Sequence, residues 1–217
     1  MAERIPARGR AVASREDAPV IDEADVLRRG LEAFAELGYE ATTVRELAKR
    51  LGVSHNYIND RYQSKLGFWK AVVDSVARPI TFGALIVADR ASSDEERLVS
   101  AVTAFCRNAV NNPEINRIIA DESVRDSDRL AYLFEEYVAP WWAQLSPAIK
   151  RLMKAGRIRP VPLNMVFFAI TWPALALTQK AMAQRLRRDA DKETITSEQL
   201  AELVLAGLLP MRGKQSK

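Results

Sequence analysis

The chain has 217 residues, which suits one large domain or two small ones. Its 48% of hydrophobic residues allows a sizeable core and excludes wholesale disorder. The formal net charge of +4 permits a nucleic-acid partner without requiring one. Cys106 and His55 are the only cysteine and histidine, which argues against disulfides and against a zinc site with Cys and His ligands. We therefore expect neither a metal nor a cofactor.

No part of the sequence has the pattern of a targeting or membrane-spanning segment. The first twenty residues lack the apolar core of a secretory signal. The longest apolar stretch runs from Met165 to Leu177 and falls short of the ~20 residues that cross a bilayer. We expect a cytoplasmic protein without a membrane partner, and a lone cysteine agrees with a reducing compartment.

The chain divides into an arm and two helical regions. Residues 1–20 hold four arginines, two prolines and no apolar period, which predicts a flexible arm that either has no role or reaches a DNA groove. From residue 21 apolar residues recur at helical spacing and no stretch alternates with period two, which predicts an all-α protein. Short helices give way to long ones near residue 70. This predicts one domain over residues 21–70 and a larger helical domain over residues 71–217.

Capping residues predict where the helices begin. Gly38 ends a first helix, and Thr43 with Glu46 three residues later is the pattern that begins a second one. Ser54 is predicted to cap a third helix over residues 55–62, and Ser64 a fourth. Later helices are predicted to begin at Ser93, Asn112-Pro113, Val161-Pro162 and Thr196.

Residues 43–62 are typical of a helix-turn-helix, whose second helix enters the major groove of DNA. Gly52 supplies the backbone freedom of the turn, and the small Ala48 lets the two helices approach closely. The charge agrees, because residues 41–70 carry six basic and two acidic side chains, whereas residues 22–40 carry two basic and six acidic ones. The alternative is an ordinary helical corner with a solvated charged face.

The stretch from Val26 to Val73 resembles the DNA-binding domain of the TetR family of bacterial regulators. The residues that carry the resemblance are Phe34, Gly38-Tyr39, Thr42-Thr43, Ala48, Gly52-Val53-Ser54, Tyr62 and Ser64-Lys65. It implies an N-terminal three-helix helix-turn-helix domain, followed by a larger, variable helical domain that binds a small ligand and dimerises. One departure is that the family usually has tyrosine where this chain has Asn59, and an aromatic residue stands two places earlier at Tyr57. Together with the acidic Asp60, this departure argues for an unusual operator.

The candidate DNA contacts fall into two groups. Residues on the exposed start of the recognition helix are predicted to read bases, since an Asn side chain can pair with adenine: His55, Asn56, Tyr57 and Asn59. Residues near helix starts, together with nearby cations, are predicted to contact phosphates: Thr42, Thr43, Arg45, Ser54, Arg61 and Lys65. Thr43 is equally expected to cap its helix, and both roles can hold at once.

Aromatic residues mark the larger domain. Leu130, Phe134, Tyr137 and Trp141 are spaced as one stripe of a long helix, which Pro140 is expected to kink or break. Such a stripe is core by default, and part of it can line an apolar pocket between helices. The candidate pocket residues are Phe105, Phe134, Tyr137, Trp141 and Trp172.

Two apolar segments near the end of the sequence, 162–184 and 196–209, predict a dimer interface, because such faces need a partner. In the family the last two long helices of each subunit form this interface. The candidate contacts are Met165, Phe168, Ala169, Trp172, Leu200, Leu203, Val204 and Gly207. A two-fold dimer would place two recognition helices about 34–36 Å apart on a near-palindromic site.

The resemblance therefore implies a homodimeric transcriptional regulator, most often a repressor that binds an operator and is released by a small effector, and the aromatic content suggests that this effector is apolar. The alternatives are an activator, a regulator without a small ligand, or a helical protein-interaction module. An all-α enzyme would need Cys106 or a carboxylate pair such as Glu95-Glu96, and neighbouring residues on a helix point in different directions. We expect no catalytic residues.

Overall fold

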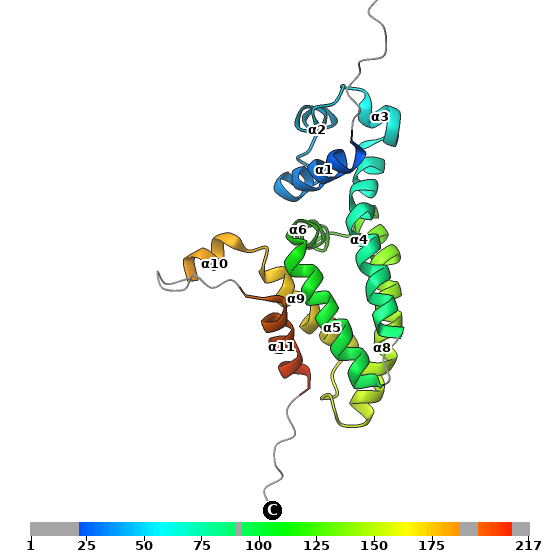
Figure 1. Cartoon of the computed structure of the whole chain (residues 1–217), viewed down its shortest axis with the longest axis vertical. Coiled ribbons are helices and arrows are strands. Elements are labelled where there is room, and N and C mark those ends of the chain that lie inside the picture. The colour runs from blue at the N-terminus through cyan, green and yellow to red at the C-terminus, as the bar shows by residue number, and fades with distance from the viewer. Residues whose placement is uncertain (1–21, 90–92, 187–194, 210–217) are drawn as a thin grey trace, which may run out of the picture.

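The computed structural model describes residues 22–89, 93–186 and 195–209, and every element in these ranges is a helix (Figure 1). The all-α prediction is confirmed. The helices of the N-terminal domain are α1 (Glu23–Leu37), α2 (Val44–Leu51) and α3 (Tyr57–Tyr62). The remaining elements are α4 (Lys65–Asp89), α5 (Asp94–Asn111), α6 (Pro113–Glu122), α7 (Asp128–Leu133), the π-helix η2 (Phe134–Val138), α8 (Ala139–Lys154), α9 (Leu163–Ala176), α10 (Lys180–Leu186) and α11 (Ser197–Leu208).

The helix starts that were predicted from caps are confirmed with one exception, and the starts of α7 and α10 were not predicted. The side chains of Thr43 and Ser93 each accept a hydrogen bond from the backbone N–H three residues on, and Thr196 forms a full capping box with Gln199. The third helix begins at Tyr57, so its predicted start at residue 55 is wrong. Residues 55 and 56 form a turn in which the Tyr57 N–H donates to the Ser54 carbonyl at 3.1 Å, and the Ser54 side chain caps nothing in the described structure.

The N-terminal domain lies at one end of the molecule, and α4 leads from it along the larger domain (Figure 1). Helix α4 passes through residue 70 without a break, so the expected domain boundary lies inside a helix. A first core cluster joins α1–α4 to α6 and the α7–η2 segment, and its members include Phe34, Phe68, Ile118 and Tyr137. The N-terminal domain therefore shares apolar contacts with the larger one.

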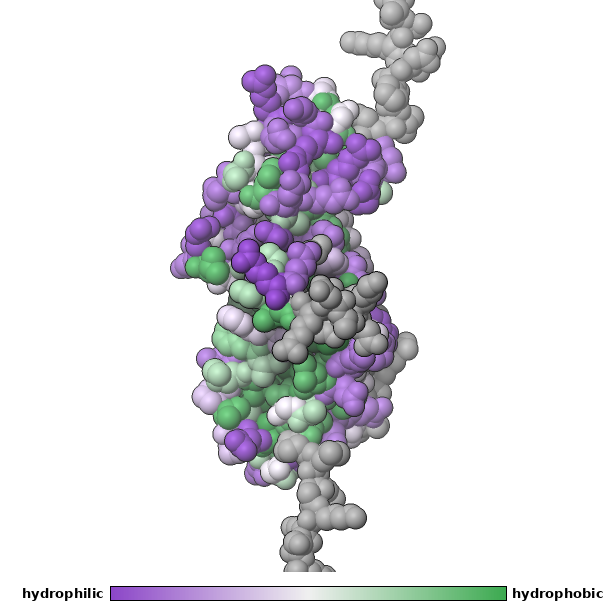
Figure 2. Space-filling view, turned by 90° about the vertical axis from the view of Figure 1, so that its left-hand side faces the viewer, coloured by the Kyte–Doolittle hydropathy of each residue, from purple (hydrophilic) through white to green (hydrophobic). Residues whose placement is uncertain are grey.

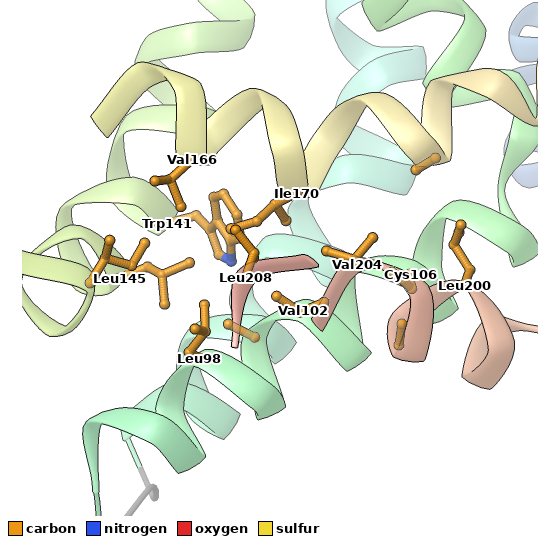
Figure 3. Packing of buried hydrophobic residues seen from close by; sticks show 14 of the residues in the cluster. Leu98, Val102, Cys106, Trp141, Leu145, Val166, Ile170, Leu200, Val204 and Leu208 are labelled. Atoms are coloured by element: carbon orange, nitrogen blue, oxygen red, sulfur yellow. The ribbon is translucent and has the colours of Figure 1, made fainter. Parts of the chain in front are cut away.

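A second core cluster fills the larger domain between α5, α8, α9 and α11. Trp141 lies at its centre, surrounded by side chains of α5, α9 and α11, among them Val102, Ile170 and Leu208 (Figure 3). Burial of these side chains is the main stabilising contribution to this domain. Cys106 belongs to the same cluster and is fully buried.

The predicted stripe of Phe134, Tyr137 and Trp141 is interrupted. A π-helical turn over Phe134–Val138 separates α7 from α8, directly before Pro140, which has no backbone N–H to continue a regular helix. The wider turn rotates the helix surface, so Phe134 is 52% exposed while Tyr137 and Trp141 are buried. The expectation of one continuous stripe is wrong, although the predicted distortion at Pro140 is present.

Candidate nucleic-acid interface

Helices α2 and α3 form the predicted helix-turn-helix. Leu47 and Ile58 are completely buried between them, and Gly52 adopts a left-handed backbone with φ 70°. The chain then reverses, and the Val53 N–H donates to the carbonyl of Ala48 at 3.1 Å. This arrangement holds α3 at the surface of the N-terminal domain with its first turn outward.

The structure brings the predicted base-reading residues together at the start of α3. His55, Asn56 and Asn59 are exposed, and so is the acidic Asp60. Tyr57 is half-buried, because its ring lies edge-on to Tyr62 with 6.3 Å between ring centres. The exposed side chains are amides, an imidazole and a carboxylate, which are the hydrogen-bonding groups that can address base edges.

Some of the residues predicted to contact phosphate have exposed side chains, and others already form hydrogen bonds within the domain. Arg45 and Ser54 are exposed, and Thr43 is exposed while its hydroxyl accepts from the Glu46 N–H at 3.1 Å. Thr42 is fully buried, and its hydroxyl donates to the Gly38 carbonyl at 2.6 Å. The prediction for Thr42 is therefore wrong, since its side chain braces the α1–α2 loop and cannot reach a phosphate.

Arg61 is bound by the first helix. Its guanidinium forms a two-sided ion pair with Glu23, in which Nε donates at 3.1 Å, and the Tyr62 hydroxyl donates to the same carboxylate at 3.2 Å. The hydrogen bond from Arg61 lowers the pKa of Glu23, so the carboxylate stays charged at neutral pH. Arg61 thus fastens the end of α3 to the start of α1, which sequence reasoning missed.

Lys65 is also occupied within the domain. Its ammonium donates to the carbonyls of Tyr39 at 3.0 Å and Thr42 at 2.9 Å, and it lies 4.0 Å from the centre of the Tyr39 ring. Two of its three N–H bonds are used in this way. Arg45 and Lys49, one turn apart on α2, are exposed and form no ion pair among the described residues. Lys49 was not among the predicted contacts, although its i, i+4 spacing from Arg45 points to it.

Residues 26–72 match the sequence profile of the family described as bacterial regulatory proteins, tetR family. The N-terminal domain belongs to the TetR family. No curated protein matches the chain in sequence.

Solved structures share the fold of almost the whole chain. A TetR family transcription regulator from Marinobacter aquaeolei VT8 is 20% identical with a TM-score of 0.61, over 86% of this chain and 94% of its own. AibR in complex with isovaleryl coenzyme A and operator DNA is 17% identical with a TM-score of 0.68, over 86% and 97%. A mutant of HlyIIR is 20% identical with a TM-score of 0.67, over 86% and 94%. The larger domain is therefore similar in fold to theirs as well.

Replacing Lys65 by methionine should destabilise the TetR-family domain, because two carbonyls lose a charged donor. We expect the free energy of unfolding to fall by about 1–3 kcal/mol, measured by urea unfolding. Lys49→Met is the matched control and should change it by less than about 0.5 kcal/mol, since Lys49 is exposed. Equal stability of the two variants would contradict the bracing role of Lys65.

The predicted pocket residues of this TetR-like chain do not gather in one place. Phe105 and Trp141 pack together with 5.9 Å between ring centres, beside Trp142 and Phe167. Tyr137 lies in the other core cluster, where its hydroxyl and that of Tyr132 both donate to Asp74. Phe134 and Trp172 are largely exposed. Only Phe105 and Trp141 therefore lie together in the core of the larger domain.

The largest correction among the predicted interface residues concerns α11. Leu200 and Val204 are buried against the core of their own chain, so they do not face a partner. The other predicted contacts are exposed on α9 and α11: Met165, Phe168, Ala169, Trp172, Leu203 and Gly207. We call these six residues the α9–α11 face. Figure 2 shows hydrophobic residues gathered on this side of the larger domain, below the hydrophilic N-terminal domain.

Two features of the described residues bear on catalytic chemistry, namely possible metal ligands and the cysteine thiol. They contain no cluster of three or more His, Cys, Asp or Glu side chains that would hold a metal ion. Burial raises the pKa of the Cys106 thiol to about 11, which keeps it protonated at neutral pH and without the thiolate that a nucleophile needs. No helix in the described ranges is long and apolar enough to span a membrane.

Proposed function

We propose that the chain is a homodimeric DNA-binding transcriptional regulator that represses from a near-palindromic operator and is released by a small apolar effector. The observation that carries the proposal is the exposed start of α3, where His55, Asn56 and Asn59 stand clear of a buried helix-turn-helix core. A helix of this kind fits a major groove, where outward hydrogen-bonding side chains can read base edges.

The free cations of α2 support the DNA-binding part of the proposal. Arg45 and Lys49 are exposed on the helix that would cross the phosphate backbone, and neither is neutralised by a carboxylate in the described structure. Arg50 is held by Glu36 at 2.6 Å and Glu46 at 3.0 Å, and Arg61 by Glu23. Phosphate contacts are therefore expected from Arg45, Lys49 and the hydroxyl-bearing helix start at Thr43.

The α9–α11 face supports the dimer. Trp172 is 63% exposed and Leu203 64% exposed, and large apolar side chains in this number are seldom left open to water. A two-fold contact on this face would bury α9 and α11 of both subunits and leave the N-terminal domains free. Each dimer would then present two copies of α3 to two half-sites.

The effector is the part of the proposed function that rests most on proteins of similar structure. AibR was solved with isovaleryl coenzyme A and operator DNA, so a protein of this fold binds both an acyl ligand and DNA. In this chain the aromatic residues Phe105, Trp141, Trp142 and Phe167 lie together between α5, α8 and α9, and helices that part there would expose an apolar site. Repression and release by an effector are linked by reciprocity: DNA should weaken effector binding as much as effector weakens DNA binding.

The proposal is tested by selecting duplexes from a random library with the purified protein at physiological salt. An enriched near-palindrome supports a dimeric reader of sequence, and a single enriched half-site supports DNA binding without the dimer. Failure to enrich any sequence, with the protein folded, would contradict DNA reading and favour a protein-interaction module. Reporter expression with and without the protein then distinguishes a repressor from an activator.

Asn56→Ala and Tyr57→Ala should each weaken binding to the selected operator by about 1–3 kcal/mol and change binding to random DNA much less. The amide of Asn56 is exposed, so its loss removes a base contact without disturbing the fold. Because Tyr57 packs on Tyr62, its variant also needs a measured melting temperature. Asn111→Ala, an exposed asparagine at the end of α5, is the control and should leave both affinities unchanged. Equal losses on operator and random DNA would contradict base reading.

A further inference from the structure

An arginine of the larger domain contacts the loop between α1 and α2. Arg129 lies on α7, and its guanidinium donates to Glu40 of this loop at 2.9 Å and to Glu122 of α6 at 2.8 Å. The same group lies 3.9 Å from the centre of the Tyr39 ring. One side chain therefore binds two residues of the N-terminal domain and one of the larger domain.

This contact is shielded from solvent on the side of the larger domain. The Arg129 side chain is 15% exposed and that of Glu122 is 7% exposed, whereas Glu40 is 70% exposed. Glu122 also accepts from the Ser127 hydroxyl at 3.4 Å. Glu122 of α6 therefore holds one edge of the Arg129 guanidinium, and the other edge faces the α1–α2 loop. A planar guanidinium that is held on two edges and stacked on a ring has one favoured orientation.

The α1–α2 loop, which Arg129 contacts, leads directly to the start of α2, the helix end proposed to face DNA. Tyr39 lies within reach of two cations, Arg129 at 3.9 Å and Lys65 at 4.0 Å, and Lys65 also binds the carbonyls of Tyr39 and Thr42. The next residue, Thr43, caps α2. The position of Tyr39 therefore sets the position at which α2 begins, and with it the placement of Arg45.

We propose that Arg129 is a positioning residue, which holds the N-terminal domain at one angle to the larger domain and so fixes the separation of the two recognition helices in a dimer. The inference rests on the proposed function, because it concerns a dimer that reads two half-sites. Apolar contacts of α1 with α6 also join the domains, but such contacts are not directional, whereas the Arg129 contacts are. Loss of the Arg129 contacts with the α1–α2 loop should leave the fold intact. It should let the distance between the two recognition helices of a dimer vary.

Two conservative substitutions weaken the contact of Arg129 with the α1–α2 loop. Glu40→Gln removes the cross-domain ion pair and keeps the pair of Arg129 with buried Glu122. Arg129→Lys keeps a positive charge beside Glu122 and loses the two-edged fork and the stacking on Tyr39. Glu32→Gln is the matched control: it removes one exposed charge from the same domain, where Glu32 pairs only with Arg28 of its own helix in the described structure.

The measurement is the affinity for the selected operator, for duplexes whose half-sites are moved by one and two base pairs, and for a single half-site. Native protein and Glu32→Gln should favour one spacing. Arg129→Lys and Glu40→Gln should bind that spacing about tenfold more weakly, discriminate less between spacings, and bind the half-site as the native protein does. The two changes should not be additive in the double variant, because both break one link.

The outcomes separate the two proposals. Absence of duplex binding by the native protein would overturn the proposed function and the positioning role with it. Native binding with a spacing preference that Arg129→Lys and Glu40→Gln leave unchanged would overturn the positioning role alone. Weaker half-site binding together with a lower melting temperature would also overturn it, because a merely structural residue acts on every duplex alike.

Discussion

A Gly67→Ala variant should lose about 3 kcal/mol of the free energy of unfolding, the largest effect we expect from a single methyl group in this chain. A Cβ atom at Gly67 would lie 2.1 Å from the carbonyl oxygen of Tyr62 and 3.2 Å from its carbonyl carbon. Both are backbone atoms at the end of α3, so no side chain can rotate to make room. Either the start of α4 or the end of the recognition helix must shift.

The shift would act on the DNA-facing helix as well as on stability. The Gly67 N–H donates to the Ser64 hydroxyl oxygen at 3.0 Å, which caps the start of α4, and Gln63 between the helices has a left-handed φ of 67°. The Tyr62 ring packs on Phe68 with 5.0 Å between ring centres. The connection between α3 and α4 is closely packed, so a shift at Gly67 should also move the recognition helix. We therefore expect operator affinity to fall together with stability.

Urea unfolding followed by circular dichroism measures the effect. Gly83→Ala on the same helix is the matched control, because a Cβ there meets nothing within 4 Å. Alanine inside a helix is favoured over glycine, so the control should gain up to about 1 kcal/mol. A Gly67→Ala variant as stable as the native chain would show that the backbone at Tyr62 can move freely, against the geometry described above.

The elements that sequence predicted well are those whose causes are local. Thr43, Ser93 and Thr196 cap helices through backbone groups three residues away, so their patterns are visible in a short window. The start of α3 was misplaced because a turn held by the Ser54 carbonyl competes with the Ser54 cap. The π-helical turn at Phe134 was missed for a similar reason: Pro140 announces a distortion but does not say which kind.

The candidate site was predictable only where exposure decides the role. His55, Asn56 and Asn59 lie outward as expected, because the apolar Ile58 between them must lie inward. Arg61 was misjudged because its partner Glu23 stands 38 residues earlier in the sequence, and no window shows that pair. Burial of Thr42 likewise depends on the carbonyl of Gly38 and on the way α1 and α2 fold together.

Helix α11 shows the same limit for the interface. Helix α11 has enough apolar residues to form two apolar faces. Periodicity alone does not predict which of the two faces packs against α5. In the structure Leu200 and Val204 cover it and Leu203 and Gly207 lie outside. Only the outer set is available to a partner, so a test of the dimer must use a residue from that set.

Trp172→Asp should convert the protein to a monomer of native fold. The side chain is 63% exposed, and its described ring contact is with Phe168, which is itself exposed. A carboxylate there is solvated in a monomer but buried beside an apolar partner in a dimer, which is costly. We expect the dimer dissociation constant to rise at least roughly 100-fold, as expected for a central tryptophan of an interface. Sedimentation at micromolar concentration measures it.

The same variant links the interface to DNA reading. Two half-sites bound by one dimer act as a single multivalent ligand, so a monomer should lose most of its affinity for the whole operator and keep its affinity for one half-site. Val124→Asp is the control, since Val124 is 73% exposed in the α6–α7 connection, outside the α9–α11 face. That variant should stay dimeric and bind the operator normally. If Trp172→Asp also stayed dimeric, the subunits would have to meet elsewhere, and the α9–α11 face would need another occupant.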